Sequence, residues 1–192
     1  MHLSLMDPRF IITVVVVVLI VGIIVGVYLE RRKKHTLELR SQFGTEYNRA
    51  VVVHGSEQKA EAKLADRATR VEKLNIRELA PTERARFLAE WQTVEARFVD
   101  HPKGAVTEAD ELVSALLLAR GYPVAEFDQR AADLSVDHPL VMESYRSAHA
   151  VAVRSGAVQA TTEELRAAMI HYRSIFDELA QAPVLAEQKS AA

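Results

Sequence analysis

The chain has 192 residues, a formal net charge of −2 and no cysteine. This length accommodates one domain of ordinary size and an accessory segment, since domains commonly run to about 100–150 residues. Residues 36–192 contain 19 Lys and Arg against 24 Asp and Glu, a net charge of −5. This acidic balance argues against nucleic acid as the main partner, because phosphate binding needs a basic face. The lack of cysteine fits a reducing compartment.

The first predicted element is a transmembrane helix over residues 10–29. Its sequence, FIITVVVVVLIVGIIVGVYL, carries no charge, and at about 1.5 Å per residue it spans the hydrocarbon thickness of a bilayer. A soluble core helix is not apolar on every face for so many turns. Residues 1–9 form a short, weakly basic leader, and no small-residue cleavage site follows the apolar run. A retained anchor is therefore favoured over a cleaved signal peptide.

The residues directly behind the apolar run predict its orientation. Arg31, Arg32, Lys33 and Lys34 follow it, whereas the leader carries Arg9. Because the more basic flank stays in the cytoplasm, the N-terminus is expected outside and the C-terminal domain inside the inner membrane. Basic residues beside a membrane also attract anionic lipid, by about 1 kcal/mol each. Membrane lipid is thus an expected partner of residues 10–34.

Gly22 and Gly26 form a GxxxG pattern within the apolar run. Small residues at this spacing let two membrane helices approach closely, and packing between them then favours pairing. Glycine is also frequent in membrane helices for other reasons. The pattern is compatible with a homodimer through this face and does not require one.

Residues 30–75 are predicted to form a basic juxtamembrane segment and a charged helical stalk. Gly44 and Gly55 interrupt the helical pattern, and Ser56 suits the cap of a helix over residues 57–74. The apolar seam of that helix is thin, and charges of both signs cover its other faces. The seam consists of Ala60, Leu64, Val71 and Leu74. This pattern is typical of a solvated helix or of a helix that lies on a partner.

Residues 76–180 are predicted to form a compact, all-α bundle of about five helices with short connections. Pro81 suits a first helical position, and Thr161 with Glu164 forms a capping box. Apolar stripes at helical spacing follow the predicted starts and contribute about 1.5–3 kcal/mol for each large side chain that they bury. They include Phe87, Trp91, Val106, Leu112, Leu116, Tyr145, Leu165, Met169, Tyr172 and Phe176. Residues 181–192 are predicted to be a disordered tail.

The tetrapeptide VDHP occurs at residues 99–102 and again at 136–139. The seventeen residues after each copy share one identity, and their apolar positions are out of phase, so the copies do not mark a duplication. Proline disfavours helix in the residue before it and fits the first turn of a helix. An Asp or His just ahead can accept hydrogen bonds from the free N–H groups. Both copies therefore indicate helix starts rather than metal-binding corners.

No motif for a known chemistry is present: HExxH, Gly-x-Ser-x-Gly, and the Walker and dinucleotide loops are all missing from the sequence. No cofactor, metal site or catalytic activity is predicted. One loose constellation remains, because Tyr145, Arg146 and His149 lie on one long predicted helix and His171 and Arg173 on the next. If these helices pack antiparallel, the five side chains could line one ligand groove.

Several longer strings between residues 41 and 179 carry a family resemblance: RVEKLNIREL, RFVDHP, ARGYP, QRAADLSVDHP, YRSAH and TEELRAAMIHYR. On these strings the chain resembles a family of bacterial, membrane-anchored helical proteins that are often labelled membrane or secreted and have no assigned activity. Ala80 stands where the family has a capping Ser, a change that weakens a helix start by about 1 kcal/mol. The label "secreted" disagrees with the orientation predicted from the basic flank, which we retain.

These observations favour a single-pass membrane protein whose helical domain binds protein partners as an interaction or scaffold module. The alternative is a helical small-ligand sensor or enzyme that uses the predicted groove between the last two long helices.

Overall fold

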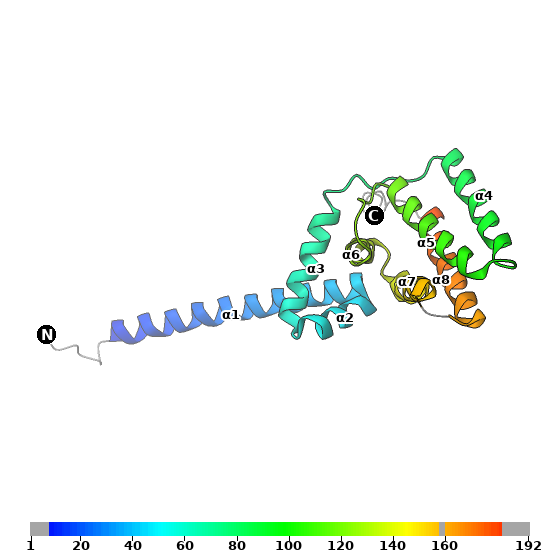
Figure 1. The fold of residues 1–192 in the computed structure, drawn as a ribbon. Helices are drawn as coiled ribbons and strands as arrows, with labels where there is room; N and C mark the ends of the chain where they lie inside the picture. The colour runs from blue at the N-terminus through cyan, green and yellow to red at the C-terminus, as the bar shows by residue number, and fades with distance from the viewer. Residues whose placement is uncertain (1–7, 158–159, 182–192) are drawn as a thin grey trace. The chain divides into compact units, whose positions relative to one another are not determined.

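The computed structural model describes residues 8–157 and 160–181, and within these ranges the chain is helical with no strand (Figure 1). The all-α prediction is confirmed. The elements in chain order are α1 (Pro8–Phe43), α2 (Thr45–His54), α3 (Glu57–Val71), α4 (Pro81–Arg97), α5 (Pro102–Ala119), α6 (Phe127–Asp137), the 3₁₀ helix η1 (Pro139–Val141), α7 (Met142–Ala157) and α8 (Thr162–Gln181). Most of the predicted disordered tail lies outside the described residues.

The chain divides into two compact units, Met1–Ser41 and Gln42–Ala192. In the first unit, α1 is one continuous helix whose large apolar side chains from Ile12 to Leu29 are 45–65% exposed. Its most apolar window has a mean hydropathy of 3.1 and buries none of its residues. Among the described residues, α1 is the helix long and apolar enough to span a membrane.

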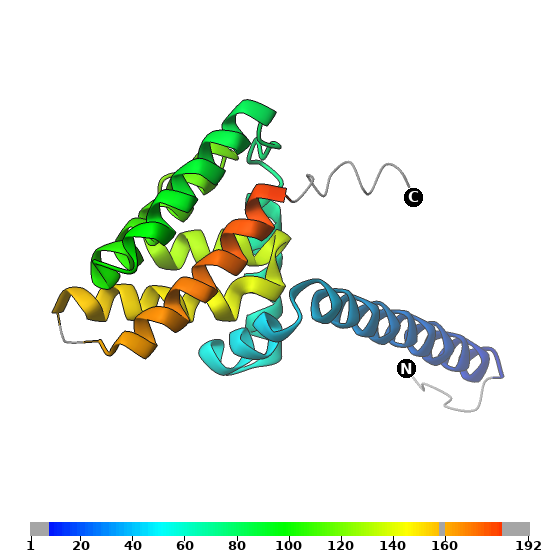
Figure 2. The ribbon, with the colours of Figure 1, turned by 90° about the vertical axis from the view of Figure 1, so that its right-hand side faces the viewer.

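The core of the second unit lies among α4, α5, α7 and α8. α8 packs against α5 and α7, and α4 packs against α5 (Figures 1 and 2). The rings of Trp91 and Phe176 stack between α4 and α8 with centroids 4.8 Å apart. α8 begins at the predicted capping box: Thr161 N–H donates to the Glu164 carboxylate at 2.8 Å, and Glu164 N–H donates to Thr161 Oγ1 at 3.2 Å. The predicted apolar stripes thus face one core.

Residues 42–75 of the segment predicted as a basic juxtamembrane region and charged stalk belong to the same compact unit as the bundle. α3 packs on both α2 and α6, and Tyr47, Ala60 and Leu64 are each no more than 1% exposed. The predicted apolar seam is the buried side of α3. It packs against other helices of the same chain, so α3 is not a solvated helix. The sequence does not distinguish a charged side chain that forms an ion pair with another helix from one that is exposed to water. The charges of α3 were therefore interpreted as solvent-exposed.

Both copies of VDHP start helices, as predicted: Pro102 opens α5 and Pro139 opens η1. The residues before them adopt one backbone conformation, with φ and ψ of −135° and 65° at His101 and −129° and 55° at His138. Neither histidine side chain caps the following helix. The repeated tetrapeptide is therefore one backbone turn used twice, and its histidines do not make the capping hydrogen bonds that were predicted for Asp or His.

The helix start at Ala80 has a substitute for the missing capping side chain. The Glu83 carboxylate accepts from the Ala80 N–H at 2.9 Å and from both terminal nitrogens of Arg77 at 2.8 Å. These hydrogen bonds to Arg77 and Ala80 lower the pKa of Glu83 to about 2. One half of a capping box therefore holds the start of α4.

Candidate functional site

The structure does not bring the five predicted groove residues into one groove. α7 and α8 pack together as the prediction required, but successive residues of a helix point about 100° apart. Tyr145 is therefore fully buried and His149 half-buried, while Arg146 points toward α2. On α8, Arg173 faces α4, and His171 is half-buried.

Tyr145 and His149 belong to a polar cluster built around Asp110 of α5. The Asp110 Oδ1 atom accepts from the Tyr172 hydroxyl at 2.8 Å and lies 3.2 Å from His149 Nδ1. The Asp110 and His149 side chains are each 20% exposed. Four helices contribute to this Asp110 cluster, whose members are Asp110, Ser114, Arg130, Tyr145, His149 and Tyr172.

His149 is held on two sides within the Asp110 cluster. Its ring stacks on Phe127 of α6, with centroids 3.6 Å apart and an interplanar angle of 5°. With a proton on Nδ1, the imidazole donates to Asp110, which leaves Nε2 as an acceptor. A ring fixed in this way links α5, α6 and α7 and is not free to turn toward a bound molecule.

The Tyr145 hydroxyl is buried and finds no hydrogen-bond partner among the residues that the structure describes. Burial raises the pKa of Tyr145 to about 12, with the Arg130 charge opposing and the Asp110 charge adding to the effect. Burial also raises the pKa of Tyr172, and the Asp110 carboxylate beside it raises it further. Both phenols are therefore neutral at ordinary pH, and of the two it is Tyr172 that donates a hydrogen bond to Asp110.

We expect the stability of the folded chain to fall steeply in alkaline solution. Unfolded tyrosine ionises near pH 10, whereas burial holds the pKa of Tyr145 at about 12 and raises those of Tyr122 and Tyr172. Above about pH 10 the unfolded chain thus binds fewer protons than the folded chain. The free energy of unfolding therefore decreases as the pH rises above that value. Tyrosinate absorbance recorded together with circular dichroism checks this, with Tyr145→Phe as the control. Ionisation of all tyrosines near pH 10 in a folded chain would contradict it.

Arg146 forms an ion pair with Glu46 of α2. Its guanidinium donates at 2.6 Å and 3.3 Å to the two carboxylate oxygens, and the side chains are 19% and 6% exposed. Nearby, Arg70 of α3 lies 3.2 Å from Asp133 of α6, a carboxylate that is 1% exposed. Burial raises the pKa of Asp133, and the Arg70 charge opposes this. Opposite charges therefore connect α2 and α3 to the bundle.

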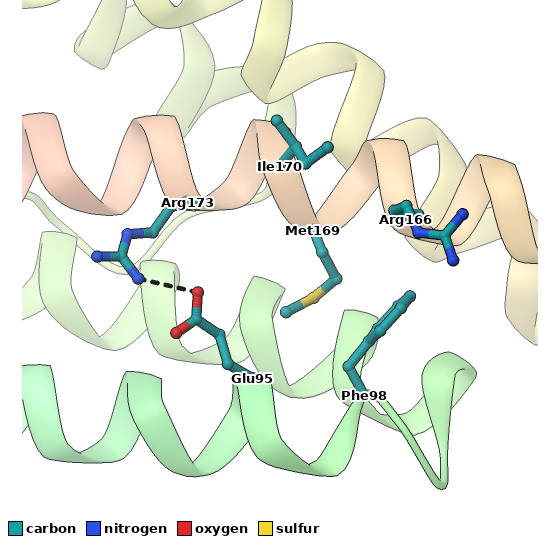
Figure 3. A pocket seen from close by; sticks show the side chains of 6 residues that line it. All are labelled: Glu95, Phe98, Arg166, Met169, Ile170 and Arg173. Carbon is teal, nitrogen blue, oxygen red and sulfur yellow. Dashed lines mark hydrogen bonds and ion pairs between the residues drawn. The ribbon is translucent and has the colours of Figure 1, made fainter.

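Arg173 lines a pocket between α4 and α8 of about 340 Å³ (Figure 3). The α4–α8 pocket is lined by Glu95, Phe98, Arg166, Met169, Ile170 and Arg173. The Met169 side chain points into the space between the two helices, and the Arg173–Glu95 pair bridges one end of it at 2.8 Å. Arg173 also donates to Asp177 at 2.7 Å, so its positive charge is paired with two carboxylates of the same chain.

The residues singled out in α1 lie in the first unit. A Cβ added at Gly22 or Gly26 would meet nothing within 4 Å, so both positions leave room for a second helix. The predicted topology signal consists of Arg31, Arg32, Lys33 and Lys34, which are exposed along the same helix. Within residues 8–157 and 160–181, no group of three or more His, Asp or Glu side chains is arranged to hold a metal ion.

The roles of Asp110, Glu46 and Asp133 in buried polar contacts were not predicted from the sequence, although the positions of two of them indicate such contacts. Asp110 lies one helical turn from the buried Val106 and Val113 of α5, and Asp133 lies one turn before the buried Val136 of α6. A carboxylate within an apolar stripe predicts a buried polar partner. Glu46 lies on a short helix with no clear stripe, and nothing in the sequence points to Arg146.

The fold and the site together define an all-α protein with a candidate membrane-spanning helix and a bundle stabilised by internal polar clusters. No family model, curated protein or solved structure matches the chain.

Proposed function

We propose that this chain is a membrane-tethered protein-interaction or scaffold module. A single span holds it in the inner membrane, with the N-terminus outside and the bundle in the cytoplasm. The observation that carries the proposal is α1, whose apolar side chains from Ile12 to Leu29 are exposed on every face. Water is a poor solvent for such a surface, and a bilayer is a good one. The four basic residues that follow favour a cytoplasmic location for the bundle.

A topology experiment tests this arrangement, because the chain has no native cysteine to interfere. Ser190→Cys places one thiol near the C-terminus for a membrane-impermeant reagent. We expect membrane fractionation of the chain and no labelling until the cells are opened. Labelling in intact cells would place the bundle outside the cytoplasm, and a chain washed from membranes by alkaline carbonate would contradict the tether itself.

Binding is favoured over catalysis by the way the polar side chains are used. Arg146 and Arg173 are paired with carboxylates of the protein, and His149 is held between Asp110 and Phe127. A ligand would have to break these contacts to reach the predicted groove residues. The α4–α8 pocket, by contrast, lies at the surface with apolar side chains in its lining, which supports a role in contacting another molecule.

The proposal includes self-association through the Gly22 and Gly26 face of α1. Gly22→Ile would add a branched side chain where two helices approach, and we expect it to weaken association by about tenfold or more. Fluorescence energy transfer between labelled chains in lipid vesicles measures this. Ile24→Ala changes the opposite side of the helix and serves as the matched control. Equal transfer in all three chains would remove the dimer from the proposal.

A further inference from the structure

We propose that an exposed patch on α2 and η1 rests on the headgroup layer of an anionic bilayer. The α2–η1 patch consists of Arg49, Val52 and Val53 of α2 and Leu140 of η1. Its aliphatic side chains insert among the lipid headgroups, and its arginine binds lipid phosphate. The inference rests on the proposed membrane tether and goes beyond it, because these residues belong to the unit that contains the bundle and not to the membrane span.

The patch groups aliphatic side chains that are largely exposed. Val52 and Val53 are 82% and 65% exposed, and Leu140 is 93% exposed. Because η1 packs on α2, the three side chains come from adjacent elements. Arg49 shares the exposed face of α2 with the two valines, at a spacing of three and four residues. Exposed apolar side chains beside a cation are typical of a surface that lies in a membrane interface.

The charges around the patch favour an anionic lipid. Apart from a histidine, the charged residues of α2 are Glu46 and Arg49, and η1 has none. Glu46 is 6% exposed and is paired with Arg146, whereas Arg49 is exposed and forms no ion pair among the residues that the structure describes. Glu143 follows η1 in the first turn of α7. Arg67 of α3 offsets this negative charge, because its guanidinium lies near that of Arg49.

The contact requires α2 to return toward the bilayer from the end of α1, and the helix lengths permit this. α1 continues from Leu29 to Phe43, about 21 Å of helix, and the ten residues of α2 span about 15 Å. Gly44 alone separates the two helices, and its φ of 50° allows a sharp turn. Val52 and Val53 lie in the last turn of α2. The difference of about 6 Å matches the headgroup layer, which is about 5–8 Å thick on each side of the hydrocarbon.

Lipid quenching of a fluorescent probe tests the inference with the full-length chain in vesicles. The chain has no native cysteine, so Val52→Cys places one fluorophore on the patch. Val99→Cys, at a position that is 84% exposed, places the same fluorophore in the turn between α4 and α5, away from α2 (Figure 1). With spin-labelled headgroups, we expect about fivefold stronger quenching of the Val52 probe in phosphatidylglycerol-containing vesicles than in phosphatidylcholine alone. The Val99 probe should remain unquenched in both.

Arg49→Glu should abolish the preference for anionic vesicles. Arg86→Glu, an equal change of charge on α4, is the matched control and should preserve it. Unaltered Trp91 fluorescence would verify that both variants still fold.

The other outcomes separate the patch from the tether. An unquenched Val52 probe in a chain that resists alkaline carbonate would overturn the inference and leave the tether intact. Equal quenching in neutral and anionic vesicles would overturn the assignment to anionic lipid. A probe shielded from aqueous iodide but not quenched by lipid would show that protein covers the patch, which also overturns the inference. A chain that carbonate extracts would contradict the proposed function and the inference together.

Discussion

Replacing Phe176 with alanine should lower the free energy of unfolding by about 3–5 kcal/mol. Phe176 is fully buried on α8, and its ring stacks on Trp91 of α4 at an interplanar angle of 25°. The substitution removes buried apolar surface and leaves a cavity that the surrounding helices fill only in part. It also removes the aromatic contact that joins α4 to α8, so the loss should lie at the upper end of that range.

Urea unfolding of the full chain in detergent micelles measures this effect. The chain contains one tryptophan, so the fluorescence of Trp91 reports directly on the stacked pair. Ile170→Ala on the same helix is the control, because a side chain that is 63% exposed should change stability by about 0.5 kcal/mol or less. If the two variants lose equal stability, the Trp91–Phe176 contact does not hold α4 on the bundle.

Replacing Arg146 with alanine should cost about 3 kcal/mol, the second large effect that we expect. The substitution leaves the Glu46 side chain, which is 6% exposed, without its ion-pair partner. A buried carboxylate that loses its hydrogen-bonded partner retains much of the penalty of leaving water, and the positive charge of Arg67 near Glu46 offsets a part of it. Because Glu46 lies on α2, we also expect the backbone amides of α2 to exchange with solvent faster than those of α5.

A double-mutant cycle with Glu46→Gln separates the pair from its surroundings. The double variant should be more stable than the sum of the two single changes indicates, because neither charge is then buried alone. Arg154→Ala on the same helix is the matched control. Its ion pair with Glu164 is 58% and 41% exposed, and such a pair contributes about 0–1 kcal/mol. Additive losses in the cycle would show that Arg146 and Glu46 are not coupled.

The sequence by itself determined the local structure of this protein. A long uncharged run predicts the α1 helix because backbone polar groups in so apolar a segment are satisfied within a helix. Pro81, Pro102 and the Thr161–Glu164 capping box mark helix starts because their conformational preferences act within a few residues. The apolar stripes identify the buried faces of the helices for the same reason, since helical periodicity is a local property.

Only the tertiary structure decided which charged groups face one another. Glu46 and Arg146 are a hundred residues apart in the chain, and no local pattern relates them. In α2 and α3, Tyr47, Ala60 and Leu64 are buried, and the charges of Glu46 and Arg70 meet opposite charges on α7 and α6. The five predicted groove residues do not share a groove, because core packing sets how each helix is rotated about its axis. On α7 this rotation turns Tyr145 inward and Arg146 toward α2. Ion pairing depends on geometry between helices, which residue type and spacing within one helix do not specify.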